Sequence, residues 1–400
     1  MHELKSPNKF NIFISTGEVS GDLQGSMLIA ALKRQASARN LELNIVALGG
    51  DRMVTAGATL LGDTSGIGSV GILESIPYIL PTLQIQKQAK KYLQQNPPDL
   101  VVLIDYVGPN LGLLQFLTKN LPLVPIVYYI APQDWIWAVS PRNTTRIVAH
   151  IKRLLAIFPG EARYFAEKGA AVSWVGHPLI DRLQTTPDRA TAREILGISS
   201  TETAIALFPA SRQQEIKYLL PIMFTAAKQI QDKLPNVSFW IPLSLPVYRE
   251  AIASAIQNYG LHANIVEGKA NEVISAVDLA ITKSGTVNLE IALLNVPQVV
   301  IYRVNSFTWW VATKLFNFSI PFMSPVNLVQ MKSIVPELLQ AKATPENIVS
   351  HALELLLNAD RRQETINEYQ EMRRCLGEVG VCDRAAKEIL EILPVNHINS

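Results

Sequence analysis

The sequence predicts an α/β protein built from two similar Rossmann-like domains. Strand-like apolar runs alternate with helical patterns along most of the chain, which is typical of parallel sheets covered by helices. The polar stretch 184–193 interrupts this alternation, and the same pattern then starts again. With 400 residues, of which 48% are hydrophobic, the chain is long enough to give each domain a full core.

Each strand is predicted where a short apolar run ends in glycine, proline or polar residues. Thr344 and Pro345 predict a helix cap and a first helical residue, and apolar residues then recur at helical spacing. The predicted organisation is a first domain over 1–183, a second over 184–343 and closing helices over 344–400. The predicted strands cover 10–15, 44–48, 100–104, 124–129, 153–157 and 171–175, and then 204–208, 237–241, 263–266, 278–282 and 298–302.

Composition excludes several classes of protein. The net charge is only +2 and the basic residues are scattered, so nucleic acid is not an expected partner. Cys375 and Cys382 are too few for a disulfide framework and predict free thiols in a reducing compartment. The polar N-terminus has no apolar signal core, and prolines interrupt the best membrane-spanning candidate, 315–331. We expect a cytoplasmic protein that is soluble or lies on a surface.

One candidate site follows the first predicted strand. Ligands of parallel α/β sheets bind beyond the carboxyl ends of the strands. In "STGEVSGD" the glycines Gly17 and Gly21 would let backbone approach a ligand, and the following helix would offer N–H groups, with Glu18 and Ser20 beside them. The alternative is a tight turn in which Ser20 or Asp22 caps the helix.

Two more loops of this kind occur in the second half. "ALFPASRQQEI" places Ser211 and Arg212 between a strand and a helix, and "AITKSGTVNLEIALL" does the same for 283–286. Hydroxyls, amides and a cation at such a position suit a phosphate or pyrophosphate, although neither loop matches a Walker or Rossmann motif. Either loop alone could be a capped turn, but two such loops on adjacent strand ends favour a nucleotide. The second loop supplies Lys283, Ser284, Gly285 and Thr286.

Five segments, in order and in spacing, resemble the lipid-A-disaccharide synthases, a family of bacterial glycosyltransferases. They are "TGEVSGD", "WVGHPL", "SRQQEIKYLLP", "KSGTVNLE" and "NLVQMKSIVPELLQ". The resemblance implies two Rossmann-like domains of the GT-B type facing a central cleft. The N-terminal domain would bind the acceptor, the C-terminal domain would bind the UDP-sugar, and the terminal helices would pack back on the N-terminal domain.

The implied reaction moves a diacylglucosamine from its UDP derivative to the primary hydroxyl of an acylated glucosamine 1-phosphate. The α-linked donor gives a β-linked product, so one general base must act on the acceptor hydroxyl. The leaving UDP would be stabilised by Arg212 and by the amides near Ser284, Gly285 and Thr286, and Lys283 could contribute as well. The sequence has no Asp-x-Asp pair, so neither a metal nor a cofactor is expected.

The same resemblance implies that two further residues contact the donor. Glu290 could hydrogen-bond the ribose hydroxyls, with a solvated helix carboxylate as the alternative, and Asn327 matches a family residue that faces the donor. His177 could touch the donor, but we favour a role in ordering the crossing between the domains.

The chain departs from the family pattern at two positions. The family usually has Ile-Asp-x-Pro-Asp-Phe-Asn, whose second aspartate is the favoured base, whereas Gly108 takes that place in "LIDYVGPNLGL". Asp105 is therefore the first choice of base and Glu18 the second, with a loop cap as the alternative for Asp105. Ala210 replaces the glycine of Pro-Gly-Ser-Arg and adds a Cβ where backbone would approach phosphate.

An acylated acceptor requires an enzyme that reaches a membrane surface. The segment 66–81 is apolar around the single charge Glu74, and Lys87, Lys90 and Lys91 follow it. It also matches the membrane-docking region of the family, although a buried helix is the alternative. A second candidate is 307–318. We expect a peripheral protein on the cytoplasmic face of the inner membrane, and a homodimer is left open.

Three rival functions share much of this evidence. A related enzyme could use another glycolipid acceptor, which the change at Gly108 keeps open. A non-catalytic member could bind a nucleotide-sugar or a lipid. An epimerase of UDP-sugars would share the architecture but consume donor without any acceptor.

Overall fold

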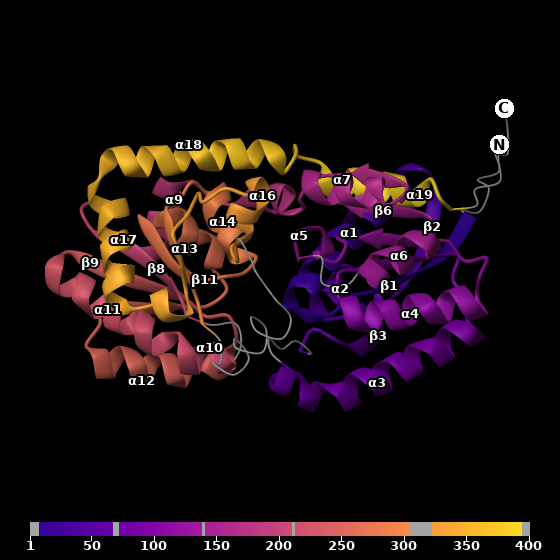
Figure 1. The fold of residues 1–400 in the computed structure, drawn as a ribbon, viewed down its shortest axis with the longest axis horizontal. Coiled ribbons are helices and arrows are strands. Elements are labelled where there is room, and N and C mark those ends of the chain that lie inside the picture. The colour runs from indigo at the N-terminus through magenta and orange to yellow at the C-terminus, as the bar shows by residue number, and fades with distance from the viewer. Residues whose placement is uncertain (1–7, 67–71, 138–140, 210–212, 304–321, 394–400) are drawn as a thin grey trace, which may run out of the picture. The chain divides into compact units, whose positions relative to one another are not determined.

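The protein consists of two compact α/β units in a computed structural model, which describes residues 8–66, 72–137, 141–209, 213–303 and 322–393. Unit 1 comprises Met1–Asp181 and Leu376–Ser400, and unit 2 comprises Arg182–Cys375. Each unit contains one parallel sheet covered by helices (Figure 1). The predicted fold class is confirmed.

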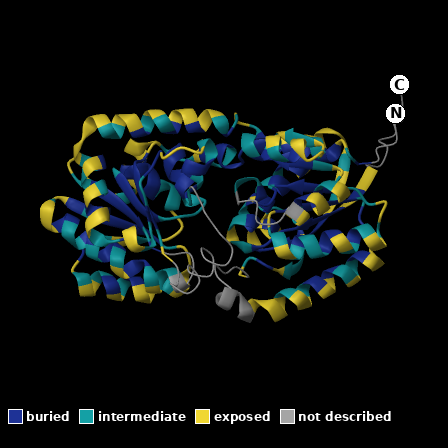
Figure 2. Cartoon of the chain, viewed as in Figure 1, coloured by how far each residue is buried: buried dark blue, intermediate teal, exposed yellow. Residues whose placement is uncertain are grey.

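The sheet of unit 1 has seven parallel strands in the order β3-β2-β1-β4-β5-β6-β7. The central strands β4 (Leu100–Ile104) and β5 (Ile126–Tyr129) are buried along their whole length, as expected where helices cover both faces of a parallel sheet (Figure 2). The other strands are β1 (Asn8–Ser15), β2 (Leu41–Gly49), β3 (Thr59–Asp63), β6 (Arg153–Ala156) and β7 (Val172–Trp174). The helices are α1 (Glu18–Ala38), α2 (Asp51–Thr55), α3 (Ile72–Gln95), α4 (Val107–Asn120), α5 (Asp134–Trp137), α6 (Pro141–His150), α7 (Pro159–Glu167), α8 (Leu179–Arg182), whose last residue begins unit 2, and α19 (Val381–Leu390).

The sheet of unit 2 has six parallel strands in the order β10-β9-β8-β11-β12-β13. They are β8 (Thr203–Phe208), β9 (Val237–Pro242), β10 (Ala263–Val266), β11 (Leu279–Lys283), β12 (Gln298–Tyr302) and β13 (Glu337–Leu339). The α-helices are α9 (Arg189–Leu196), α10 (Gln213–Tyr218), α11 (Leu220–Lys233), α12 (Arg249–Tyr259), α13 (Ala270–Ala276), α14 (Val287–Leu293), α16 (Pro325–Gln330), α17 (Pro345–Leu357) and α18 (Ala359–Cys375). Short 3-10 turns cover Leu183–Thr185, Pro246–Tyr248 and Gln340–Lys342.

Both sheets reverse their strand order at one place. In unit 1 the reversal lies between the neighbours β1 and β4, and in unit 2 it lies between β8 and β11. The crevice beyond the carboxyl ends of such a strand pair is where open α/β sheets bind ligands. All the glycine- and hydroxyl-rich loops that the sequence predicted as sites follow β1, β8 or β11, and Asp105 follows β4.

The expected domain boundaries are partly wrong. The closing helices do not all return to the first unit, because α17 packs on α11, β11 and β12, and α18 packs on α14 and α16. The buried face of α17 belongs to the core of unit 2, so unit 2 extends to Cys375 rather than to 343. Only the segment from Leu376 belongs to unit 1, where α19 lies against α1 (Figure 1). Thr344 does cap α17, since its side chain accepts from the Asn347 amide.

Sequence analysis did not predict two of the strands, β3 and β13. β3 is a five-residue edge strand with a register shift against β2, and its residues are mostly half-buried or exposed. β13 has three residues and also lies at an edge. Short, partly exposed edge strands carry little of the apolar pattern that reveals buried strands.

The segment that returns to unit 1 is held by close backbone packing. The His177 amide donates to the Leu376 carbonyl at 2.8 Å. Gly176 has φ +90°, and a Cβ there would lie 2.8 Å from that same carbonyl oxygen, so only glycine fits. The Asp181 carboxylate accepts hydrogen bonds from the amides of Gly380, Val381 and Cys382 and so caps α19.

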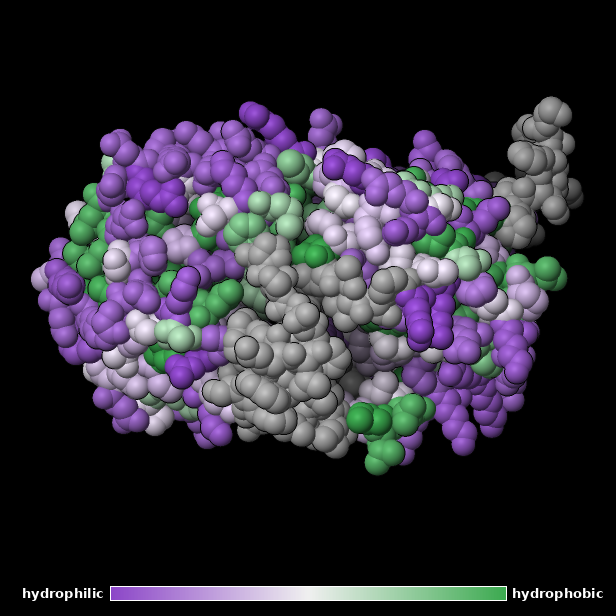
Figure 3. All heavy atoms as spheres, viewed as in Figure 1, coloured by the Kyte–Doolittle hydropathy of each residue, from purple (hydrophilic) through white to green (hydrophobic). Residues whose placement is uncertain are grey.

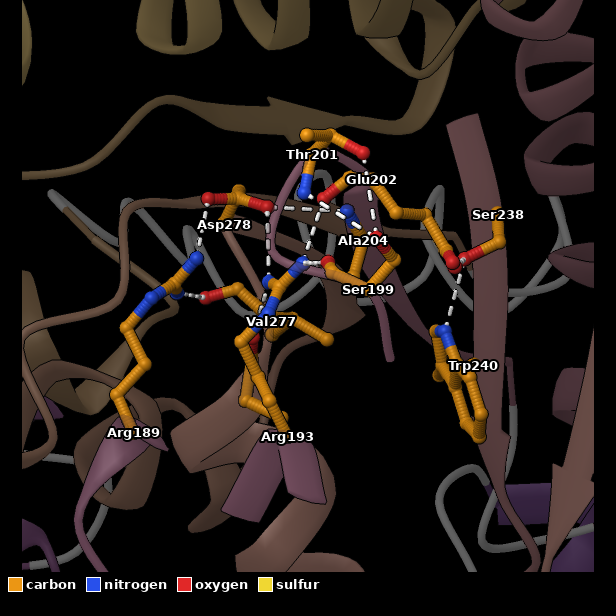
Figure 4. Close-up of polar contacts among 11 residues, drawn as sticks. Arg189, Arg193, Ser199, Thr201, Glu202, Ala204, Ser238, Trp240, Val277 and Asp278 are labelled. Carbon is orange, nitrogen blue, oxygen red and sulfur yellow. Dashed lines mark hydrogen bonds and ion pairs between the residues drawn. The ribbon is translucent and has the colours of Figure 1, made fainter. Parts of the chain in front are cut away.

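Helix α9 is fastened to the amino ends of β8 and β11 (Figure 4). The buried Arg193 guanidinium donates to the carbonyl oxygens of Ala276, Ser199 and Glu202. Arg189 binds Asp278 at 2.7 Å, and the other oxygen of Asp278 accepts from the Ala204 amide at 3.0 Å. This cluster lies at the amino ends of the strands, whereas the predicted sites lie at their carboxyl ends, so its role is structural.

None of the helices in the described parts of the chain is both long and apolar enough to cross a membrane. Cys375 and Cys382 are free thiols, as expected.

Candidate active site

In unit 1 the loops after β1 and β4 are joined by one buried amide. The side chain of Asn110, on α4, donates to the carbonyl oxygens of Asp105 (2.8 Å), Ile104 (3.1 Å) and Ser15 (3.3 Å). Its oxygen accepts from the Ser15 hydroxyl at 2.7 Å. Sequence analysis missed Asn110; the signal available was an amide one turn into a helix that follows a buried strand.

Both candidate bases lie on left-handed backbone. Glu18 has φ 61° and Asp105 has φ 43°, and the following Tyr106 has φ 47°. Non-glycine residues seldom adopt this region, and it costs about 1–3 kcal/mol each where the surroundings impose it. Such strain recurs at functional sites. Here it gathers at the carboxyl ends of β1 and β4, where the strand order reverses.

The carboxyl group of Asp105 has an altered acidity. Its side chain keeps contact with solvent, yet the surrounding protein removes much of its hydration and the Glu18 carboxylate adds a like charge. These two effects outweigh the hydrogen bond from the Tyr106 amide and raise the pKa of Asp105 to about 6. The Glu18 carboxylate, at the end of β1, therefore acts electrostatically on Asp105, at the end of β4.

The predicted glycines pack closely against side chains of the protein. A Cβ at Gly17 would lie 2.4 Å from the Tyr106 ring, and a Cβ at Gly21 would lie 2.0 Å from the Thr16 hydroxyl oxygen. Side chains of the protein thus occupy the space on the Cβ side of both glycines, and the approach of a ligand to their backbone stays a prediction. Ser20 is half-buried in the first turn of α1.

Asp22 is a cap, but not of the helix that contains it. Its buried carboxylate accepts from the amides of Gly50 at 2.9 Å, Met53 at 3.2 Å and Arg52 at 3.3 Å. It therefore holds the N-terminus of α2 beside the loop after β1. The alternative interpretation was therefore correct in making Asp22 a helix cap, but the helix that it caps is α2 and not α1.

A second buried carboxylate, that of Glu161, was not identified from the sequence. Glu161 accepts from the amides of Ala131 (2.7 Å), Ile157 (2.8 Å) and Phe158 (3.2 Å) and so joins the loops after β5 and β6. Burial raises the pKa of Glu161 to about 7 in spite of these hydrogen bonds.

The imidazole of His177 makes its described contacts inside unit 1. It is buried against the Phe158 ring and accepts a hydrogen bond from the Leu179 amide at 3.2 Å. Burial lowers its pKa to about 3, which keeps it neutral. These contacts favour the interpretation that His177 orders the crossing.

In unit 2 several polar groups of the loop after β11 form hydrogen bonds with other groups of the protein. The Ser284 amide donates to the Ile301 carbonyl, and its hydroxyl donates to the Met323 carbonyl at 2.7 Å. The Gly285 amide donates to the buried Asn288 side chain at 2.8 Å. Thr286 follows at the start of α14 and is half-buried. The other loop of this pair contains Ala210, Ser211 and Arg212, which lie outside the described residues.

Lys283 and Glu290 both have charged partners. The Lys283 ammonium lies 3.4 Å from the Glu215 carboxylate on α10. Glu290 is buried and binds the Arg182 guanidinium at 2.5 Å, so it is not the solvated helix carboxylate of the alternative interpretation. Sequence analysis did not identify Arg182.

The expected donor contact of Asn327 needs correction. This side chain is fully buried. Its oxygen accepts from the amides of Ile334 (2.7 Å) and Val335 (2.9 Å), and its nitrogen donates to the Val335 carbonyl and the Glu337 carboxylate. Its hydrogen-bonding capacity is used inside the protein, so Asn327 acts on the loop around it and not by direct contact with a ligand.

The two Rossmann-like units, each with its candidate loops at a strand-order reversal, define a protein of the GT-B class. Solved structures share this fold. The UDP-GlcNAc 2-epimerase of Neisseria meningitidis bound to UDP-GlcNAc has a TM-score of 0.63 at 13% identity and covers 96% of this chain and 100% of that chain. The glycotransferase of kitacinnamycin has a TM-score of 0.61 at 16% identity, with 97% and 100% covered.

The family is shown by sequence comparison. The model of the lipid-A-disaccharide synthetase family matches residues 12–392. The lipid-A-disaccharide synthase of Gloeothece citriformis is 58% identical over 380 residues, which are 95% of this chain and 99% of that protein. This chain belongs to the lipid-A-disaccharide synthase family and is a glycosyltransferase of lipid A biosynthesis.

Proposed function

We propose that this chain transfers a diacylglucosamine from its UDP derivative to the primary hydroxyl of a diacylglucosamine 1-phosphate. The products would be a lipid A disaccharide 1-phosphate and UDP, with inversion at the donor's anomeric carbon. The observation that carries this proposal is the position of Asp105, a carboxylate beyond β4 at the strand-order reversal of unit 1, whose pKa is raised to about 6.

Asp105 has the properties of a general base. The acceptor hydroxyl must lose its proton as it attacks, and a base is most effective when its pKa lies near the working pH. A carboxyl group with a pKa of about 6 is ionised at neutral pH and is more basic than an ordinary aspartate. Gly108 itself carries no carboxylate that could compete with Asp105, and a Cβ there would meet no atom within 4 Å, so the space at this position is open.

Unit 2 would bind the donor. Arg212, the Thr286 amide and the Lys283 ammonium would stabilise the negative charge that develops on UDP, and Glu290 would accept hydrogen bonds from the ribose hydroxyls. Ser284 and Gly285 would shape this loop, and Asn327 would position the neighbouring segment that it ties to Glu337. No step of this mechanism involves a metal.

The acylated substrates would be met at the cytoplasmic face of the inner membrane. On α3 the apolar side chains of Tyr78, Ile79, Leu80 and Leu83 are 38%, 49%, 71% and 59% exposed. Figure 3 shows this apolar surface on the lower edge of unit 1. Lys87 and Lys91 are exposed further along the same helix, as an anionic surface would require. The side chains of 67–77 and the second candidate, 307–318, lie outside the described part of the chain.

Release of UDP from a defined donor and acceptor tests the reaction. We expect UDP and a disaccharide 1-phosphate by mass spectrometry when both substrates are present, and no turnover with an acceptor that lacks the primary hydroxyl. Consumption of the donor alone would indicate an epimerase. UDP binding without turnover on any acceptor would indicate a non-catalytic member, and turnover only on a different glycolipid would change the acceptor.

The donor site has a separate test. Arg212→Ala should weaken UDP binding by about tenfold or more, because a hydrogen bond to a charged group contributes about 1.5–3 kcal/mol. Unchanged UDP affinity by calorimetry would remove Arg212 from the site.

A further inference from the structure

The side chain of Asn288 joins the two ends of the loop after β11. Its oxygen accepts from the Gly285 amide at 2.8 Å, and its nitrogen donates to the Lys283 carbonyl at 3.1 Å. Asn288 is fully buried and lies in the first turn of α14. One amide group, which has both donors and an acceptor, therefore fixes the backbone on both sides of Ser284.

A second buried amide, that of Gln298 at the start of β12, sets the orientation of the first. The Gln298 nitrogen donates to the main-chain carbonyl of Asn288 at 2.9 Å, and the Gln298 oxygen accepts from the Asn288 side-chain nitrogen at 3.1 Å. Because a carbonyl group can only accept, Gln298 must direct its nitrogen toward that carbonyl and its oxygen toward the side chain. The oxygen of Asn288 is then the atom that faces the Gly285 amide.

The two amides are also connected to α18. The Gln298 nitrogen lies 3.4 Å from the hydroxyl oxygen of Tyr369, to which it donates, and both residues are buried. Helix α18 packs on α14, which carries Asn288 (Figure 1). In a buried polar network, removal of one member leaves the donors and acceptors of the others unmatched, which is costly. The network therefore favours a single conformation of the loop.

We infer that Asn288 is a positioning residue for the part of the donor site that binds the diphosphate. It holds Lys283 and Gly285 in place, so the loop that leads to Thr286 is formed before the ligand arrives and binding does not have to order it. Gln298 acts one step further away, through Asn288. This inference rests on the proposed donor site in unit 2 and adds two residues that act on the ligand only through the loop.

The affinities for UDP and for uridine, measured on each variant, test this role. Calorimetry gives the affinity for UDP, and displacement of UDP gives that for uridine. We expect the unaltered protein to bind UDP about a hundredfold or more tightly than uridine, as two hydrogen bonds to charged phosphate groups would give. Asn288→Ala should reduce this affinity ratio by about tenfold or more. The affinity for uridine should hardly change, because uridine has no phosphate.

Gln298→Met keeps the length of the side chain but removes both hydrogen bonds to Asn288. It should reduce the affinity ratio by a smaller factor, about threefold to tenfold, because Asn288 keeps its own contacts with the loop. Adding Gln298→Met to Asn288→Ala should cause no further change in the ratio, since Gln298 acts on the loop only through Asn288.

Gln231→Ala is the matched control. Gln231 is another buried amide of unit 2 that holds backbone, because it donates to the Gly260 carbonyl at 2.9 Å and accepts from the His262 amide at 2.7 Å. This segment directly precedes β10 and so lies at the amino end of a strand, whereas the donor loop lies at a carboxyl end. The substitution should lower stability and leave the ratio of UDP to uridine affinity unchanged.

The outcomes separate this inference from the donor site itself. If the unaltered protein binds UDP no more tightly than uridine, both the proposed diphosphate loop and the inference are wrong. If it prefers UDP and folded Asn288→Ala keeps the ratio, the donor site stands and the role of Asn288 is wrong. An equal loss of the ratio in Gln231→Ala would also overturn that role. Thermal unfolding shows which variants are folded, and Gln298→Met decides the question if Asn288→Ala does not fold.

Discussion

The side-chain amide of Asn110 donates a 2.8 Å hydrogen bond to the carbonyl oxygen of Asp105. The same amide also reaches the end of β1 through Ser15. One buried residue thus holds the backbone of the proposed base in its left-handed conformation and fixes it against the strand that leads to Glu18. The position of the Asp105 carboxylate follows from this network rather than from the loop sequence alone.

Asp105→Asn should lower turnover by about a hundredfold or more and leave the affinity for UDP nearly unchanged. Asparagine has a similar shape but cannot accept the proton of the acceptor hydroxyl. Steady-state kinetics and calorimetry on the same preparation measure both quantities. If turnover survives this change but not Glu18→Gln, the base is Glu18.

Activity should depend on pH through the same carboxyl group. A base acts in its deprotonated form, so kcat/KM should be constant above a pH of about 6 and fall about tenfold for each pH unit below it. Removing the like charge in Glu18→Gln should move this acidic limb to lower pH, because the Glu18 carboxylate is one cause of the raised pKa of Asp105. A limb that keeps its position in this variant would show that the two carboxylates do not interact.

Gly21→Ala should destabilise unit 1 by about 1–3 kcal/mol, because the added Cβ would lie 2.0 Å from the Thr16 hydroxyl oxygen. Thr16→Ala removes that oxygen, so Gly21→Ala should cost less stability in a Thr16→Ala background. Urea unfolding of the four proteins gives the coupling energy. Additive effects would mean that Gly21 is required for another reason, including the approach of a ligand.

Leu80→Asp combined with Leu83→Asp should reduce binding to liposomes of anionic lipid without changing thermal stability. Both side chains are mostly exposed, so the change affects the surface and not the core. Leu123→Asp is a matched control, since Leu123 is 94% exposed and belongs to the loop between α4 and β5 rather than to α3. Flotation that the double substitution leaves intact would exclude this part of α3 as the docking surface.

Much of the fold could be read from the sequence because its signals are local. All eleven predicted strands exist with shifts of a few residues, and the cap at Thr344 is where the sequence indicates. The edge strands β3 and β13 were missed because few of their residues are buried. The limits of unit 2 were wrong because α17 and α18 are amphipathic or polar helices whose sequence does not reveal which sheet they cover.

The sequence by itself determined which residue types stand at the ends of β1, β4, β8 and β11, since chain order and parallel topology bring those ends to one edge of each sheet. Only the tertiary structure decided what each residue does there. Thr16 and Tyr106 fill the space beside the glycines, Asn327 is saturated by internal hydrogen bonds, and Arg182 pairs with Glu290 from 108 positions away. Such roles depend on distances between side chains from remote parts of the chain, and a hydrogen bond or an ion pair forms only where folding brings both groups within about 3 Å.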